Sequence, residues 1–174
     1  MFSGLFLEVD ANTQFLVNPD SDPVAIRIEG KANFKNSGCL KDFINQLIDG
    51  GKRRFVMDFE ACTGMDSTFL GVMAGAALRL RKTAPRGSLV VSHLNERNNE
   101  LVQNLGLNRL LTVDDGRSVS RDDTAFLQTT EITDELQAAR EVLEAHRDLI
   151  KADDKNAEKF DGVLTFCKQQ LGES

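Results

Sequence analysis

Apolar and polar residues alternate in the first part of the chain, which is the pattern of a half-buried strand. Residues 24–28, Val-Ala-Ile-Arg-Ile, alternate in this way and are followed by Gly30. Residues 15–17 are apolar, and Asn-Pro-Asp-Ser-Asp-Pro, a sequence that favours a turn, separates them from this run. The two runs are therefore predicted to pair as a hairpin.

Farther along, the apolar residues take the spacing of helices that bury one face. They recur at intervals of three and four in residues 40–48, 70–78 and 101–105. Residues 55–59 and 88–94 are short apolar runs, typical of strands covered on both faces, and residues 110–113 predict a last strand. This alternation across residues ~14–115 predicts an α/β domain whose mixed, mainly parallel sheet is layered with helices.

The pattern changes again beyond Gly116, because residues 120–174 contain no strand-like run. Two helical stripes predict amphipathic helices that are joined around Lys151–Lys155 as an αα-hairpin, with apolar faces that the domain, the other helix or a partner must cover. We therefore divide the chain into an α/β domain, residues 1–118, and an acidic C-terminal helical extension, residues 119–174. The stripes are Leu136, Ala139, Leu143, His146 and Ile150, then Phe160, Val163, Leu164, Cys167 and Leu171.

Charge separates the same two parts. The net charge is -6, and residues 120–174 carry all of it, with 7 basic and 13 acidic residues. Residues 1–119 hold 14 of each and are neutral, which suggests that the two parts have different roles. A net negative chain without Trp or Tyr is a poor ligand for nucleic acid, so no nucleic-acid partner is expected.

The remaining composition favours a soluble protein in the cytoplasm. The 3 cysteines are widely spaced and form no C-x-x-C pair, so we expect reduced thiols and neither a metal site nor a cofactor. The opening ten residues lack the basic start of a signal peptide. No apolar stretch reaches the ~20 residues of a membrane span, so direct membrane insertion is not expected.

Candidate chemistry gathers where a predicted strand gives way to a helix, at Met65-Asp66-Ser67-Thr68. A hydroxyl there can cap the helix, attack a substrate or receive a phosphate, and Asp66 alone could also cap the helix and leave Ser67 free. As a nucleophile Ser67 would need a base, for which His93 at a neighbouring strand end is a candidate, but no G-x-S-x-G elbow surrounds it. We therefore predict a protein that is not an enzyme.

Two further motifs are given structural interpretations. The string His-Arg-Asp-Leu at residues 146–149 matches a kinase catalytic loop, but it lies inside a predicted helix and lacks an accompanying glycine-rich loop. Gly71 and Gly75 form a G-x-x-x-G pair, which we interpret as close packing of the helix on the sheet.

The order of elements, centred on residues 55–82, resembles the STAS domain family, which includes the bacterial anti-sigma factor antagonists. The family motif, Met-Asp-Ser-(Ser/Thr)-Gly-Leu-Gly, is matched in register by Met65, Asp66, Ser67, Thr68, Leu70 and Gly71. The resemblance implies a cytoplasmic regulator of transcription without catalysis of its own. Ser67 would be the phospho-acceptor, Asp66 would shape its loop, and Thr68 would be a supporting hydroxyl. An anti-sigma factor that is also a serine kinase would be the partner, with a serine phosphatase as a further one.

Two departures from the family pattern weaken the expectation that a typical anti-sigma kinase docks here, and Phe69 together with the acidic helical extension favours an alternative. Phe69 replaces the usual glycine, and Gly30-Lys31-Ala32-Asn33 replaces Gly-Glu-(Leu/Ile)-Asp, so Phe69 and Asn33 join Met65 as candidate partner-binding positions. An exposed Phe69 would make a docking patch, and a buried one would fill the core. The alternative is a constitutive docking subunit of a larger assembly, such as a transporter or lipid-export complex, with Ser67 only capping a helix. The C-terminal helices could also form a homodimer.

Overall fold

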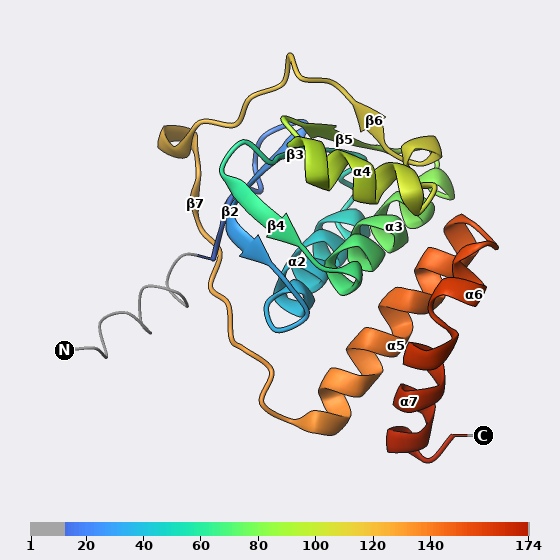
Figure 1. Ribbon diagram of the computed structural model, residues 1–174. Coiled ribbons are helices and arrows are strands. Elements are labelled where there is room, and N and C mark those ends of the chain that lie inside the picture. The colour runs from blue at the N-terminus through green and yellow to red at the C-terminus, as the bar shows by residue number, and fades with distance from the viewer. Residues whose placement is uncertain (1–12, 174) are drawn as a thin grey trace.

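The computed structural model describes residues 13–173, so the prediction about the opening ten residues lies outside the described part. Its strands form one sheet in the order β6-β5-β3-β2-β1-β7, and β4 pairs with β2 beside this path (Figure 1). The strands are β1 (Gln14–Asn18), β2 (Val24–Ala32), β3 (Arg54–Asp58), β4 (Cys62–Met65), β5 (Ser88–Ser92), β6 (Thr112–Val113) and β7 (Ala125–Phe126).

The pairing confirms the predicted mixed, mainly parallel sheet. β1 and β2 form the expected antiparallel hairpin, with Val17 opposite Ile26. The pairs β2–β3, β3–β5 and β5–β6 are parallel, and β4 runs parallel to β2. The sequence did not predict β4, and the last strand is shorter than expected, since a 3₁₀ turn over Leu107–Arg109 precedes it.

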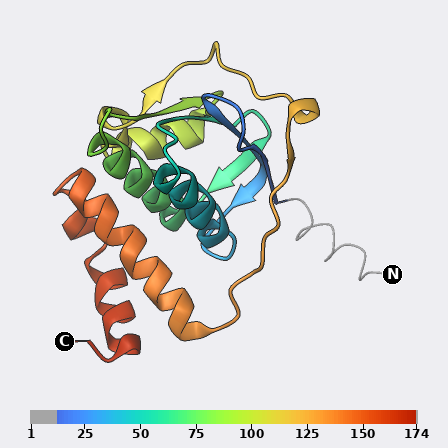
Figure 2. The same cartoon turned by 180° about the vertical axis from the view of Figure 1, so that it is seen from behind.

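Helices cover the sheet in the order that the apolar spacing predicts. The helix α3 is buried along most of its length, as expected of an element with packed neighbours on both sides. α2 lies beside α3, and α5 runs along α3 on the side away from the sheet (Figures 1 and 2). The helices are α2 (Ser37–Asp49), α3 (Ser67–Arg81), α4 (Glu96–Asn104), α5 (Glu135–Ala152), α6 (Asn156–Lys159) and α7 (Asp161–Leu171).

The predicted helical extension is confirmed, with two corrections. α5 and α7 pack against each other, and the short α6 lies between them. The prediction that no strand follows Gly116 is wrong, because β7 pairs antiparallel with β1 at Val17 and Ala125. A two-residue strand has no room for a periodic pattern, and backbone hydrogen bonding alone creates it.

The packing of the G-x-x-x-G pair is also corrected. A Cβ placed on Gly71 would collide with the carbonyl oxygen of Ala145, and one on Gly75 would lie 2.5 Å from Asp148 Oδ2. Both neighbours belong to α5 and not to the sheet. Gly71 therefore allows the backbone of α5 to approach α3 closely, and Gly75 leaves space for the side chain of Asp148. Sequence spacing alone could not assign this approach to a partner.

Candidate functional site

Asp66 caps the N-terminus of α3. Its backbone is extended, with φ -100° and ψ 174°, and its Oδ1 accepts a hydrogen bond from the Phe69 N–H at 2.9 Å. Its Oδ2 accepts a second bond at 2.8 Å, from the N–H of Phe34 in the loop between β2 and α2. The carboxylate thus satisfies one free donor of the helix and ties the neighbouring loop to it, so the cap is Asp66.

The hydroxyl of Ser67, the first residue of α3, bonds to a side chain far away in the sequence. Its Oγ lies 2.9 Å from Nε2 of His146 on α5. The other ring nitrogen, Nδ1, lies 2.6 Å from the carbonyl oxygen of Val142. Because a carbonyl can only accept, Nδ1 carries a proton, and in the neutral ring Nε2 accepts the hydrogen bond that Ser67 donates.

Burial favours this neutral form. His146 is only 2% exposed, and its ring lies edge-on to Phe160 with the centroids 4.8 Å apart. Loss of solvation lowers the pKa of His146, against the opposing effects of the Val142 carbonyl and the Asp66 carboxylate. Ser67 therefore faces an uncharged, buried acceptor.

The other predicted site residues are mostly buried. Met65 is 8% exposed, Thr68 5% and Phe69 0%. The ring of Phe69 lies 6.1 Å from that of Phe15 and 6.3 Å from that of Phe59, so this residue fills the core and makes no docking patch. A ring can replace the usual glycine here because it points inward between two other rings.

Asn33 lies in the loop that Asp66 holds, and its side chain serves that loop. Its Oδ1 accepts a hydrogen bond from the Lys35 N–H at 2.9 Å. The structure therefore brings Asp66, Ser67 and the loop of Asn33 together, and places Met65, Thr68 and Phe69 beneath them.

His93, the candidate base, bonds to a different residue. Its Nδ1 lies 3.0 Å from Oδ1 of Asp58, whose Oδ2 accepts a hydrogen bond from the Val119 N–H at 2.8 Å. The histidine beside Ser67 is His146, which sequence reasoning placed on an apolar stripe and did not connect to the site. The signal available was an imidazole on a stripe otherwise made of alanine, leucine and isoleucine.

The pair of Ser67 and His146 differs from a catalytic triad at the third position. A triad holds the histidine with a carboxylate, which stabilises the imidazolium, whereas the carbonyl of Val142 holds it here. No group of three metal-ligating side chains occurs within residues 13–173. None of the helices in this range combines the length and apolar composition needed to cross a bilayer.

Comparison with known proteins gives the family. No curated protein matches the chain. Two solved structures are similar to it: the anti-sigma factor antagonist SpoIIAA in its unphosphorylated form, at 18% identity, and the Bacillus cell fate determinant SpoIIAA in the phosphorylated form, at 20%. The first match covers 63% of this chain and 92% of the other, the second 57% and 90%, each with a TM-score of 0.49. The family described as "Mlab, STAS domain" matches residues 15–112, and the chain therefore belongs to the STAS domain family.

Proposed function

We propose that the chain is a regulatory protein–protein interaction domain of the anti-sigma factor antagonist kind, switched by phosphorylation of Ser67. A single observation supports this role most directly: Asp66 supplies the helix cap, so the adjacent hydroxyl is not needed for it. The hydroxyl of Ser67 is therefore not needed to cap α3, and its hydrogen bond is to the side chain of His146 on α5.

The position of Ser67 suits a phosphate. The first turn of a helix offers backbone N–H donors and the positive end of the helix dipole, which stabilise an anion there. A phosphoserine brings about -1.5 to -2 charges at neutral pH, beside the carboxylate of Asp66. Such a change alters which surfaces can dock at this end of α3, and no catalytic step by the chain itself is required.

The partners in this proposal are an anti-sigma factor with serine kinase activity and a serine phosphatase, and the setting is the control of bacterial transcription in the cytoplasm. The test is affinity capture from the native lysate with four baits: wild type, Ser67→Ala, Ser67→Asp and Ser88→Asp. Ser88 is exposed at the start of β5, so its substitution adds the same charge away from the site.

We expect an ATP-binding kinase on the wild-type, Ser67→Ala and Ser88→Asp baits, and its loss from Ser67→Asp. The negative charge at position 67 would repel a kinase surface that binds the neutral hydroxyl. A partner set that is the same on all four baits would reject the switch.

That result would favour the second candidate function, a constitutive docking subunit of a larger assembly such as a transporter or lipid-export complex. One observation supports it: α5 and α7 form an apolar groove of about 540 Å³ whose lining includes Phe34, Val163 and Phe166. These side chains are 37%, 36% and 60% exposed. A homodimer through the same helices stays a prediction, and light scattering would detect it.

A further inference from the structure

The helix α5 covers the end of α3 that carries Ser67. Ala145 of α5 rests on Gly71 with no space for a side chain between the two backbones. His146, the next residue, reaches Ser67 one turn earlier on α3. The extension that carries the negative charge of the chain therefore lies directly on the proposed phospho-acceptor.

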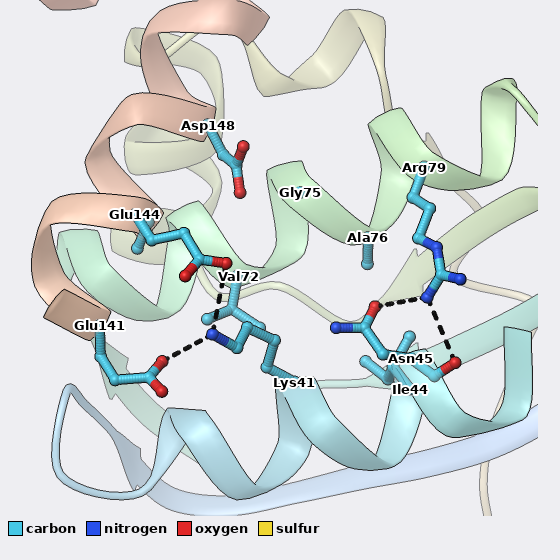
Figure 3. A pocket seen from close by; sticks show the side chains of 11 residues that line it. Lys41, Ile44, Asn45, Val72, Gly75, Ala76, Arg79, Glu141, Glu144 and Asp148 are labelled. Carbon is cyan, nitrogen blue, oxygen red and sulfur yellow. Dashed lines mark hydrogen bonds and ion pairs between the residues drawn. The ribbon is translucent and has the colours of Figure 1, made fainter. Parts of the chain in front are cut away.

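This contact is polar at its margins and incompletely filled. Lys41 of α2 pairs with Glu141 at 2.8 Å and with Glu144 at 3.5 Å (Figure 3). A cavity of about 160 Å³ lies between α2, α3 and α5, and Asp148 lines it near Gly75. The interface also buries the apolar side chains of Leu143 and Leu149, so opening of α5 is a local unfolding step that leaves the sheet in place.

We propose that α5 is an intramolecular lid over Ser67, and that the closed lid and a phosphate on Ser67 exclude one another. The lid is defined as residues 135–152. The inference that the lid regulates Ser67 rests on the proposed function. The inference that the lid opens in response to charge at position 67 does not depend on it.

Exclusion follows from what surrounds the hydroxyl. In the closed state, Ser67 donates to a neutral, 2% exposed ring and lies beside the capping carboxylate of Asp66. A dianion there would keep the N–H donors of the helix end, but it would lose water, face the Asp66 carboxylate and meet a ring whose charged form burial disfavours. α5 also restricts the approach to Ser67, which is partly exposed beside it, so opening of the lid would widen the access of a kinase.

The opposite outcome is a phosphate on Ser67 that holds the lid closed more tightly. If the phosphate drew a proton onto His146, the two would form an ion pair and tighten the lid. Burial of the ring lowers the pKa of His146 and opposes this ion pair, whereas the charge of Asp66 raises that pKa and favours it. The experiment must therefore measure the sign of the response to charge.

Hydrogen exchange of the full chain, read by mass spectrometry, measures lid opening residue range by residue range. Gly71→Ala pushes against the carbonyl of Ala145 and leaves Ser67 and His146 in place. Ser67→Glu adds the charge. The matched controls are Gly64→Ala, whose Cβ would meet no atom within 4 Å, and Ser88→Glu, which adds the same charge at the far end of the sheet.

We expect the lid, residues 135–152, to exchange at least about tenfold faster in Gly71→Ala and Ser67→Glu, as for a local opening, while β3 and β5 keep the wild-type rate. Both controls should match wild type. Wild-type or slower exchange of the lid in Ser67→Glu would overturn the proposal, since charge would then leave the lid closed. A lid that opens in a chain never phosphorylated at Ser67 would reject the proposed function and keep the lid.

Discussion

The surroundings of the two histidines of the chain shift their pKa values in opposite directions. His146 is buried, donates from Nδ1 to a backbone carbonyl and accepts from Ser67, and burial lowers its pKa. The side chain of His93 is 24% exposed and lies against the buried carboxylate of Asp58, whose hydrogen bond raises the pKa of His93. The surroundings of His146 favour its neutral form, whereas those of His93 favour its charged form.

The difference teaches which contact a change of charge can break. Burial raises the pKa of Asp58, but the N–H groups of Val119 and Glu60 and the ring of His93 bring it below its ordinary value. Several hydrogen bonds therefore hold the Asp58 carboxylate, and a proton on His93 would strengthen the contact between the two side chains. The bond between Ser67 and His146 is a single hydrogen bond to a neutral ring, and we expect an added anion to disrupt it.

The largest effect is expected from Asp58→Asn. The side chain is 1% exposed and accepts bonds from Val119, Glu60 and His93, so loss of its charge leaves buried donors without a full partner. The free energy of unfolding should fall by about 3 kcal/mol, measured by urea denaturation. Asp20→Asn, an exposed control, should change it little, and equal stability of the two variants would contradict the described role of Asp58.

A smaller effect is expected from Ser67→Ala. The substitution leaves Nε2 of His146 without its donor and should lower the free energy of unfolding by about 1 kcal/mol, measured in the same way. Thermal unfolding of Ser88→Ala gives the baseline for losing an exposed hydroxyl. If Ser67→Ala were more stable than wild type, the hydrogen bond would not be holding the lid.

The smallest and most specific effects are those of pH, and they have opposite signs for the two rings. His146 has a lowered pKa in the folded chain, so its contribution to stability is complete above pH 6.5 and is lost as the pH falls through that lowered value. His93 has a raised pKa, so its contribution is complete below pH 6.5 and is lost as the pH rises through the raised value.

Melting temperatures of wild type, His146→Gln and His93→Gln across this range should separate the two contributions. His146→Gln should lose part of the destabilisation on the acid side, and His93→Gln part of that on the alkaline side. Asp148 has a pKa raised by burial, so its contribution is complete below pH 3.8 and is lost as the pH rises, and it remains in both variants. Identical pH profiles for the two variants would contradict the opposite pKa shifts of His146 and His93.

The order of elements and the Ser67 junction were predictable because local patterns determine them. Alternating residues near Ile26, the nearly continuous apolar run at residues 55–59 and the helical spacing from Leu70 onward each reflect burial of a whole element. Asp66 was predicted as a possible cap for the same reason, since capping types at a helix start satisfy free N–H groups.

The contact between Ser67 and His146 could not be predicted, because 79 residues separate them and only tertiary packing brings them together. A histidine on an amphipathic stripe has the same spacing as a core residue. The sequence could not predict that Gly71 packs against α5 and not the sheet for the same reason. A glycine indicates a close approach but does not identify the neighbouring element.

The most direct test of the central claim is to map phosphate on the chain purified from its native cells in several growth states. Trypsin cleaves after Arg54 and Arg79, so residues 55–79 form one peptide that contains Thr63, Ser67 and Thr68, and fragment ions distinguish them. The account predicts a fraction of this peptide with one phosphate, on Ser67. An unmodified peptide in every state, or phosphate only on Thr63 or Thr68, would contradict it.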